Sequence, residues 1–175
     1  MKKSLTILKF AIILLVCSTL FTSCSEKEKV KKNKKEYSYF YPLKDNIPNM
    51  SKHETIYLPV YSHVYASEEK YEAMGVTISI RNTDFKENLL VESISYYNTE
   101  GDLIETYISK PHLLTPMASV DFVVDLNDMR GGSGANFIIK WAGKENLSTP
   151  IIQAVMVNNS GNRAFAFITN GQSIK

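Results

Sequence analysis

Short runs of β-branched and aromatic residues recur along most of this chain, and residues typical of turns bound each run. The clearest run is residues 76–82, where Val76, Ile78 and Ile80 alternate with polar residues. Alternation of this kind puts every second side chain on one face of a strand, so that one face can be buried. Further runs occupy residues 55–65, 89–97, 103–108, 120–124, 137–141, 151–157 and 165–169. The pattern predicts an all-β domain, an immunoglobulin-like β-sandwich of about eight strands, with a small β-barrel as the alternative.

One pair of runs predicts a hairpin in detail. Residues 89–97 and 103–108 flank Asn98-Thr99-Glu100-Gly101, and a glycine at the end of such a turn supplies a positive φ. The apolar residues of the first run cannot all face one side unless a β-bulge lies near Glu92 and Ser93.

Other segments give less specific expectations. Residues 151–157 are apolar on both faces apart from Gln153, which predicts a central strand. Residues 37–50 mix aromatics with proline and asparagine and are interpreted as an extended lead-in. Residues 68–74 favour helix by composition and are interpreted as a short helical turn.

The first 25 residues have the order of a secretory signal. Lysines follow Met1, residues 10–20 are almost wholly apolar, and small residues precede Cys24. The apolar run is shorter than the roughly 20 residues of a membrane span. The segment resembles bacterial lipoprotein signals, although Phe21 stands where leucine is usual. The resemblance implies removal of residues 1–23 and acylation of Cys24. An uncleaved anchor and a soluble secreted protein are the alternatives, and Cys17 is the competing acceptor.

Cleavage before Cys24 would leave one cysteine, already acylated, so the predicted fold has no disulfide. Residues 24–54 are interpreted as the lipidated cysteine, a charged tether and the lead-in, and residues 55–175 as a single domain. The segment 25–36 holds six lysines and three glutamates. Because it offers so little apolar surface to bury, it is not expected to fold. Its lysines could instead bind anionic head groups. Residues 37–175 hold 11 basic and 15 acidic residues, so nucleic-acid binding is not expected.

Several motifs occur in an order typical of one protein family. They are Leu58-Pro59-Val60-Tyr61-Ser62-His63, Ser79-Ile80-Arg81-Asn82-Thr83-Asp84, Tyr96-Tyr97-Asn98, Gly131-Gly132-Ser133-Gly134-Ala135-Asn136-Phe137, Trp141 and Pro150-Ile151-Ile152-Gln153-Ala154-Val155-Met156. Over roughly residues 57–171 the chain resembles a family of bacterial exported proteins that carries a domain of unknown function. The resemblance implies one intact envelope domain, and it implies no reaction, substrate or cofactor.

The glycine-rich segment is the first candidate site. It consists of Gly131, Gly132, Ser133, Gly134 and Asn136, with Ala135 between the last two. The segment nearly matches the G-x-S-x-G nucleophile elbow, but an elbow joins a strand to a helix, and here a strand follows. The alternatives are a structural loop and a nest of N–H groups that binds an anion. A hydrolase built on Ser133 would need one of the three histidines, His53, His63 or His112, as its base.

The second candidate site is an aromatic surface on the run 55–65. Alternation would place Tyr57, Tyr61, His63 and Tyr65 on one face. Exposed aromatic rings bind sugars or peptide side chains, whereas tyrosines at the rim of a core only cover it.

No metal or cofactor is expected from the sequence. The histidines lack the spacing of zinc ligands. Asp121, Asp125 and Asp128 lack the glycine and terminal glutamate of a calcium loop. Trp141 alternates with Phe137 and is expected in the core.

Together these features predict a lipid-anchored, non-enzymatic binding module of the bacterial cell envelope. Its partner would be another envelope protein, a polysaccharide or a small ligand. Because Ser25 rather than aspartate follows Cys24, the outer membrane is favoured, with the domain facing the periplasm or the surface. The alternatives are a hydrolase that uses Ser133 and a structural subunit of an envelope complex.

Overall fold

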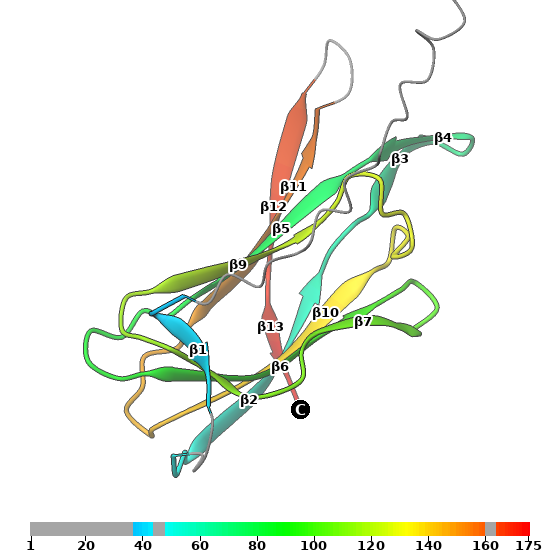
Figure 1. Cartoon of the computed structure of the whole chain (residues 1–175). Helices are drawn as coiled ribbons and strands as arrows, with labels where there is room; N and C mark the ends of the chain where they lie inside the picture. The colour runs from blue at the N-terminus through cyan, green and yellow to red at the C-terminus, as the bar shows by residue number, and fades with distance from the viewer. Residues whose placement is uncertain (1–36, 44–47, 160–163) are drawn as a thin grey trace, which may run out of the picture. The chain divides into compact units, whose positions relative to one another are not determined.

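The computed structural model describes residues 37–43, 48–159 and 164–175, and every regular element in these ranges is a β-strand (Figure 1). The strands are β1 (Phe40–Pro42), β2 (Lys52–Pro59), β3 (His63–Ser67), β4 (Lys70–Ala73), β5 (Gly75–Arg81), β6 (Leu89–Tyr97), β7 (Leu103–Ile108), β8 (His112–Leu114), β9 (Ser119–Val124), β10 (Asn136–Gly143), β11 (Ile151–Asn158), β12 (Phe165–Asn170) and β13 (Gln172–Ile174). The expected signal, Cys24 and tether lie outside the described residues. The described part of the chain holds no helix able to span a membrane.

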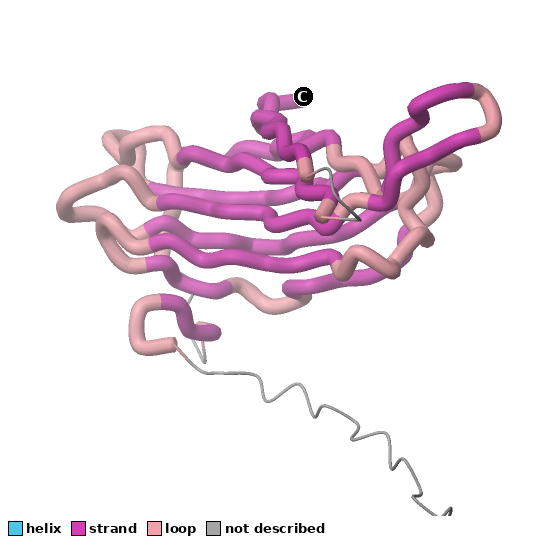
Figure 2. Tube along the Cα trace, turned by 90° about the horizontal axis from the view of Figure 1, so that it is seen from above, coloured by secondary structure: helices cyan, strands magenta, loops and turns pink. Residues whose placement is uncertain are grey.

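Two antiparallel sheets and one hairpin make up the fold. The larger sheet has the order β1-β8-β6-β10-β2-β13, with β7 also paired to β6. The smaller sheet has the order β12-β11-β5-β9, and β3 pairs with β4. Neither sheet closes into a barrel, so the predicted β-sandwich is confirmed. Figure 2 shows that strand dominates the described chain and that loops lie between the strand ends.

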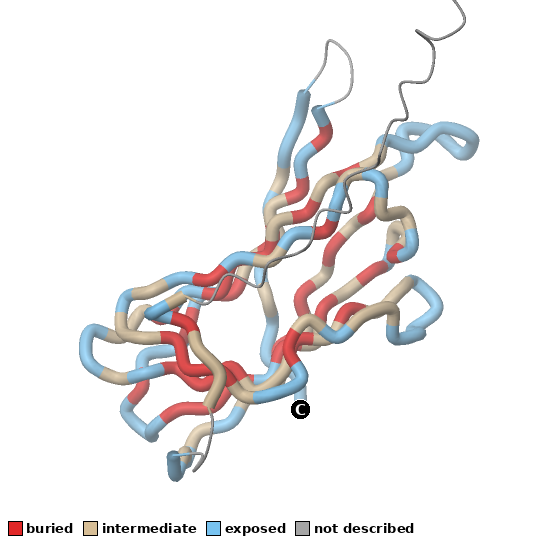
Figure 3. The backbone as a smooth tube through the Cα atoms, in the orientation of Figure 1, coloured by how far each residue is buried: buried red, intermediate tan, exposed pale blue. Residues whose placement is uncertain are grey.

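The core lies between the inner faces of the two sheets. Trp141, Phe137 and Tyr96 fill it from the larger sheet and are fully buried, as are Ile78 and Met156 from the smaller sheet. Burial alternates along the strands, as Figure 3 shows by the succession of buried and exposed positions. The period-2 patterns in the sequence therefore identify the core face of these strands correctly.

The predicted hairpin and bulge are both present. Gly101 closes the β6–β7 turn with a φ of 89°. Opposite β10, Lys140 pairs with Ser93 and Trp141 pairs with Val91, which leaves Glu92 as the extra residue of a bulge. The bulge lets Val91, like the residues beyond it, point into the core.

Two segments differ from their predicted form because tertiary pairing outweighs local composition. The lead-in contains β1, whose Phe40 is buried and stacks on His112 at 4.8 Å between ring centroids. Residues 68–74 do not form a helical turn. They form the turn after β3 and the strand β4, which pairs back onto β3.

Two further runs are only partly as predicted. The run 55–65 is divided: β2 ends at Pro59, and β3 begins at His63 outside the larger sheet. Strand β11 is central in hydrogen bonding, between β12 and β5. It is not buried on both faces, because Ile151 and Val157 are 45% and 41% exposed.

Candidate functional site

Three segments meet at the end of the sandwich that carries the glycine-rich loop. The loop between β9 and β10 is held by backbone hydrogen bonds on two sides. Val60 N donates to Ala135 O at 2.9 Å, and Ser62 N donates to Gly132 O at 3.0 Å. From the β6–β7 turn, Thr99 N donates to Gly131 O at 3.0 Å. The loop is thus tied both to the segment between β2 and β3 and to the hairpin turn.

Gly131 lies where no side chain fits. The Tyr96 hydroxyl and Ser62 Oγ form a buried hydrogen bond of 3.0 Å directly beside it. A Cβ on Gly131 would overlap the Tyr96 hydroxyl and would lie 2.6 Å from Ser62 Oγ. Burial raises the pKa of Tyr96, so this hydroxyl keeps its proton at neutral pH. Gly131 is therefore explained by close packing.

The other two loop glycines surround Thr99. Gly132 has a φ of 76°, a left-handed conformation that favours glycine. Thr99 Oγ1 donates to Gly131 O at 3.1 Å and accepts from Gly134 N at 3.0 Å. Gly132 N donates to Met129 O at 3.3 Å. Two of the N–H groups that an anion nest would use are thus engaged within the protein.

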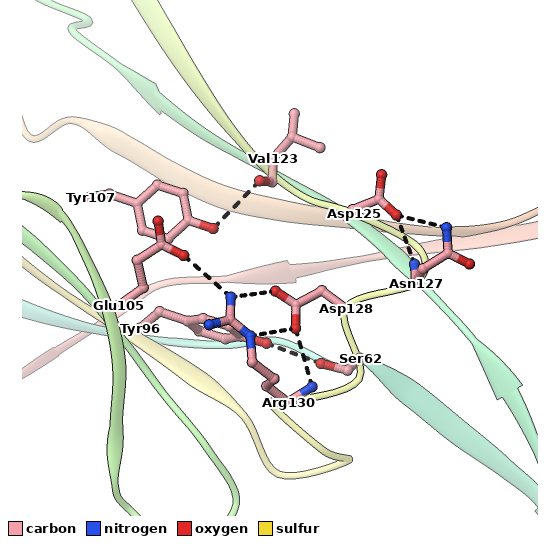
Figure 4. Close-up of polar contacts among 9 residues, drawn as sticks. All are labelled: Ser62, Tyr96, Glu105, Tyr107, Val123, Asp125, Asn127, Asp128 and Arg130. Carbon is pink, nitrogen blue, oxygen red and sulfur yellow. Dashed lines mark hydrogen bonds and ion pairs between the residues drawn. The ribbon is translucent and has the colours of Figure 1, made fainter. Parts of the chain in front are cut away.

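Arg130 fixes the start of the same loop (Figure 4). Its Nε and Nη2 donate to the two carboxylate oxygens of Asp128 at 2.8 and 2.7 Å, and Nη2 lies 3.3 Å from Glu105 Oε2. Hydrogen bonding to Arg130 holds the pKa of Asp128 below its ordinary value. Nearby, burial raises the pKa of Tyr107 to about 12, and its hydroxyl donates to Val123 O. The Arg130 guanidinium group, through its contact with Glu105, joins the loop to β7.

Ser133 does not meet a histidine in the described residues. Its loop leads directly into β10, with no helix after it. His53 Nε2 contacts Met50 O at 3.1 Å, and His112 Nδ1 contacts Lys110 O at 2.7 Å. His63 Nδ1 is buried without a hydrogen-bond partner. The described geometry thus contains no serine–histidine pair.

The four residues of the predicted aromatic surface separate into three places. Tyr57 stays in β2, opposite Ile138 and Gln172. Tyr61 is half-buried and packs edge-on against Phe167, with ring centroids 5.7 Å apart. His63 and Tyr65 lie together on β3, with ring centroids 5.0 Å apart. They separate because the chain leaves the larger sheet after Pro59.

Tyr71 joins His63 and Tyr65 from the neighbouring strand β4. It pairs directly with Tyr65, and its ring lies 5.1 Å from that of His63. Tyr65 and Tyr71 are 59% and 56% exposed. We call these three residues the aromatic hairpin tip. Sequence reasoning missed Tyr71, although the serine and glutamates before it were a signal for a turn between two short strands.

The charge around the aromatic hairpin tip is mainly acidic. Glu68, Glu69 and Glu72 are all exposed on the turn and on β4, where Lys70 is the basic residue. The rings are not coplanar: His63 makes an angle of 85° with Tyr65 and 53° with Tyr71. Among the described residues, no three His, Cys, Asp or Glu side chains come together as metal ligands.

The Asn82–Asp84 segment has a structural explanation. Asn82 is buried, and its Nδ2 lies within 3.1 Å of the carbonyl oxygens of Glu87, Leu114 and Thr115. The Asp84 carboxylate accepts from the backbone N–H groups of Lys86, Glu87 and Ser148. Those bonds, that of Ser148 foremost, hold the pKa of Asp84 far below its ordinary value. The segment organises the β5–β6 loop.

The fold and this surface define an all-β sandwich with an exposed aromatic hairpin. The chain belongs to the family described as "Protein of unknown function (DUF3124)", whose model matches residues 53–174, from β2 to β13. No curated protein matches the chain. One solved structure, "Crystal Structure of Thermotoga maritima 1070", is 13% identical and covers 70% of this chain and 96% of that chain, with a TM-score of 0.43. The predicted membership of a family with a domain of unknown function is confirmed.

Proposed function

We propose that this protein is a lipid-anchored binding module of the bacterial cell envelope, and that the aromatic hairpin tip contacts a basic segment of a neighbouring envelope protein. The observation that carries the proposal is the exposure of Tyr65 and Tyr71 on a hairpin whose turn carries the exposed Glu68 and Glu69. A hairpin that served only the core would bury such rings. Exposed aromatic side chains supply much contact area at little cost in conformational entropy.

The ring geometry favours a protein partner over a polysaccharide. A sugar stacks on a flat aromatic face, and the angles of His63 to the two tyrosines leave no plane that all three rings share. A single extended side chain can instead lie against one exposed ring face. Lysine and arginine suit this surface, because the faces of tyrosine rings attract cations and the glutamates add favourable charge.

The sequence supplies the rest of the proposal. The lipoprotein-like signal ending at Cys24 anchors the domain, with the outer membrane favoured, and the charged residues after it act as a tether. An anchored domain reaches only molecules near its membrane. The function is accordingly one of contact with a neighbour and not of catalysis.

A defined peptide pair tests the proposed surface. Fluorescence anisotropy would measure binding of the full chain in detergent to a labelled lysine-rich peptide and to a glutamate-rich peptide of equal length. We expect binding of the lysine-rich peptide only, weakened by salt and lost in the Tyr65→Ala/Tyr71→Ala variant. The matched control is Phe85→Ala, which removes an aromatic ring that is 80% exposed in the β5–β6 loop. Equal binding by both variants would refute the proposal.

A further inference from the structure

The smaller sheet has two edges, and within the described residues only one of them is protected. Strand β9 forms the first edge. It carries the exposed Asp121 and is followed by the exposed Asp125. The Tyr107 hydroxyl donates a hydrogen bond to Val123 O at 3.4 Å, so this carbonyl already has a partner. Charges and covered carbonyls are the usual means by which an edge strand is kept from pairing with another chain.

Strand β12 forms the other edge, and it lacks these features. From Ala164 to Ile174 the chain contains no charged residue and no proline. Phe165 and Ile168 are 41% and 58% exposed. In the described part of the chain β12 pairs only with β11, so its outer edge offers backbone N–H and C=O groups at every second residue.

The strand is nevertheless held in an ordered, extended form. Phe167 packs against Tyr61, and Thr169 Oγ1 donates to Pro59 O at 2.6 Å. Both side chains point to the inner face, the side on which their partners Met156 and Ala154 are buried. An added strand would therefore meet a pre-formed edge that needs little further ordering.

The outer face of the sheet continues this apolar character to the edge. One cross-strand row consists of Ile168, Val155, Thr77 and Val123, which are successive partners across β12, β11, β5 and β9. The next row consists of Ala166, Val157 and Gly75. Val157 and Val123 are 41% and 63% exposed. A strand added beside β12 would extend both uncharged rows.

We infer that β12 pairs antiparallel with β12 of a second copy of this chain, so that the two smaller sheets join across a two-fold axis. The absence of charge favours a second copy over a different partner. Two-fold pairing sets a strand against itself, so any charge on it would face a like charge nearby. An uncharged strand avoids that repulsion, and two-fold pairing closes the β12 edge of both copies in one dimer.

A charge-swap experiment tests the pairing. Two differently tagged full-length copies would be co-expressed, and the fraction that co-purifies in detergent would be measured. We expect wild-type copies to co-purify. Ile168→Lys on both copies, or Ile168→Glu on both copies, should lower the fraction about tenfold or more, because like charges that face each other across an interface oppose association. Co-expression of one Ile168→Lys copy with one Ile168→Glu copy should restore it.

The matched control is Val123→Lys, which places the same charge on the same face at the protected edge. It should leave co-purification unchanged. Failure of wild-type copies to co-purify, no loss with Ile168→Lys, no restoration by opposite charges, or an equal loss with Val123→Lys would each overturn the inference. The Tyr65→Ala/Tyr71→Ala variant should still co-purify, so this test and that of the aromatic hairpin tip fail independently.

Discussion

A methyl group at Gly131 should disturb the loop that joins the two sides of the sandwich end. The Gly131→Ala side chain would overlap the Tyr96 hydroxyl and lie 2.6 Å from Ser62 Oγ and 2.8 Å from Ala135 Cβ. All three neighbours are fully or almost fully buried, so none can move into solvent. Overpacking of this kind costs about 1–3 kcal/mol.

The Tyr96→Phe variant separates the overlap from the hydrogen bond. Alone, it leaves Ser62 Oγ buried without its 3.0 Å partner, at a cost of about 1–3 kcal/mol. In the double variant the hydroxyl that the new methyl would strike is gone. The combined loss of unfolding free energy should therefore be smaller than the sum of the single losses, by about 0.5–3 kcal/mol.

Urea denaturation followed by circular dichroism would measure all four members of this cycle. Gly75→Ala is the control, because its Cβ would meet nothing closer than 3.7 Å and its φ is not positive. It should be neutral or stabilising by about 0.4–1 kcal/mol, through the unfolded state. Strictly additive losses, or a Gly131→Ala loss as small as that of Gly75→Ala, would refute the packing explanation of the glycine.

Three other residues give further predictions. Asn82→Ala should lower the unfolding free energy by about 1–3 kcal/mol in urea denaturation, because it removes the buried donor that the carbonyls of Glu87, Leu114 and Thr115 share; a neutral result would contradict a stabilising role for Asn82. The folded pKa of Asp84 lies below its ordinary value, so its stabilisation is present above about pH 4 and is lost as pH falls. Asp84→Asn should therefore be less stable at pH 7 but lose less between pH 5 and pH 2, and identical pH profiles would refute this. Cys24→Ala should abolish labelling by radioactive palmitate, and undiminished labelling would disprove anchoring at that residue.

The sequence predicts the sandwich because a strand with one buried face has an apolar residue at every second position. Residues 76–82 and 137–141 show it, and the bulge at Glu92 is visible as a break in the same period. Strands β1, β8 and β13 have three residues each, too few for a period to appear. They form because they pair with strands already placed in the larger sheet: β8 with β6, β1 with β8, and β13 with β2.

The candidate sites were less accessible to sequence reasoning, because they depend on contacts between distant segments. Alternation places Tyr57, Tyr61, His63 and Tyr65 on one face only if their strand is continuous, and it ends at Pro59. Tyr71 approaches His63 through the pairing of β4 with β3, which the helix-favouring composition of that segment concealed. The roles of the loop glycines likewise depend on Thr99 and Tyr96, more than 30 residues away.

The proposed contact with an envelope neighbour is tested most directly in living cells. A photoreactive amino acid would replace Tyr71 in the intact, anchored chain, and Phe85 in a parallel control, followed by irradiation and mass spectrometry. We expect a protein adduct at position 71, through a lysine- or arginine-rich segment, and none of that identity at position 85. A glycan adduct at position 71, the same adducts at both positions, or no adduct at position 71 would contradict it.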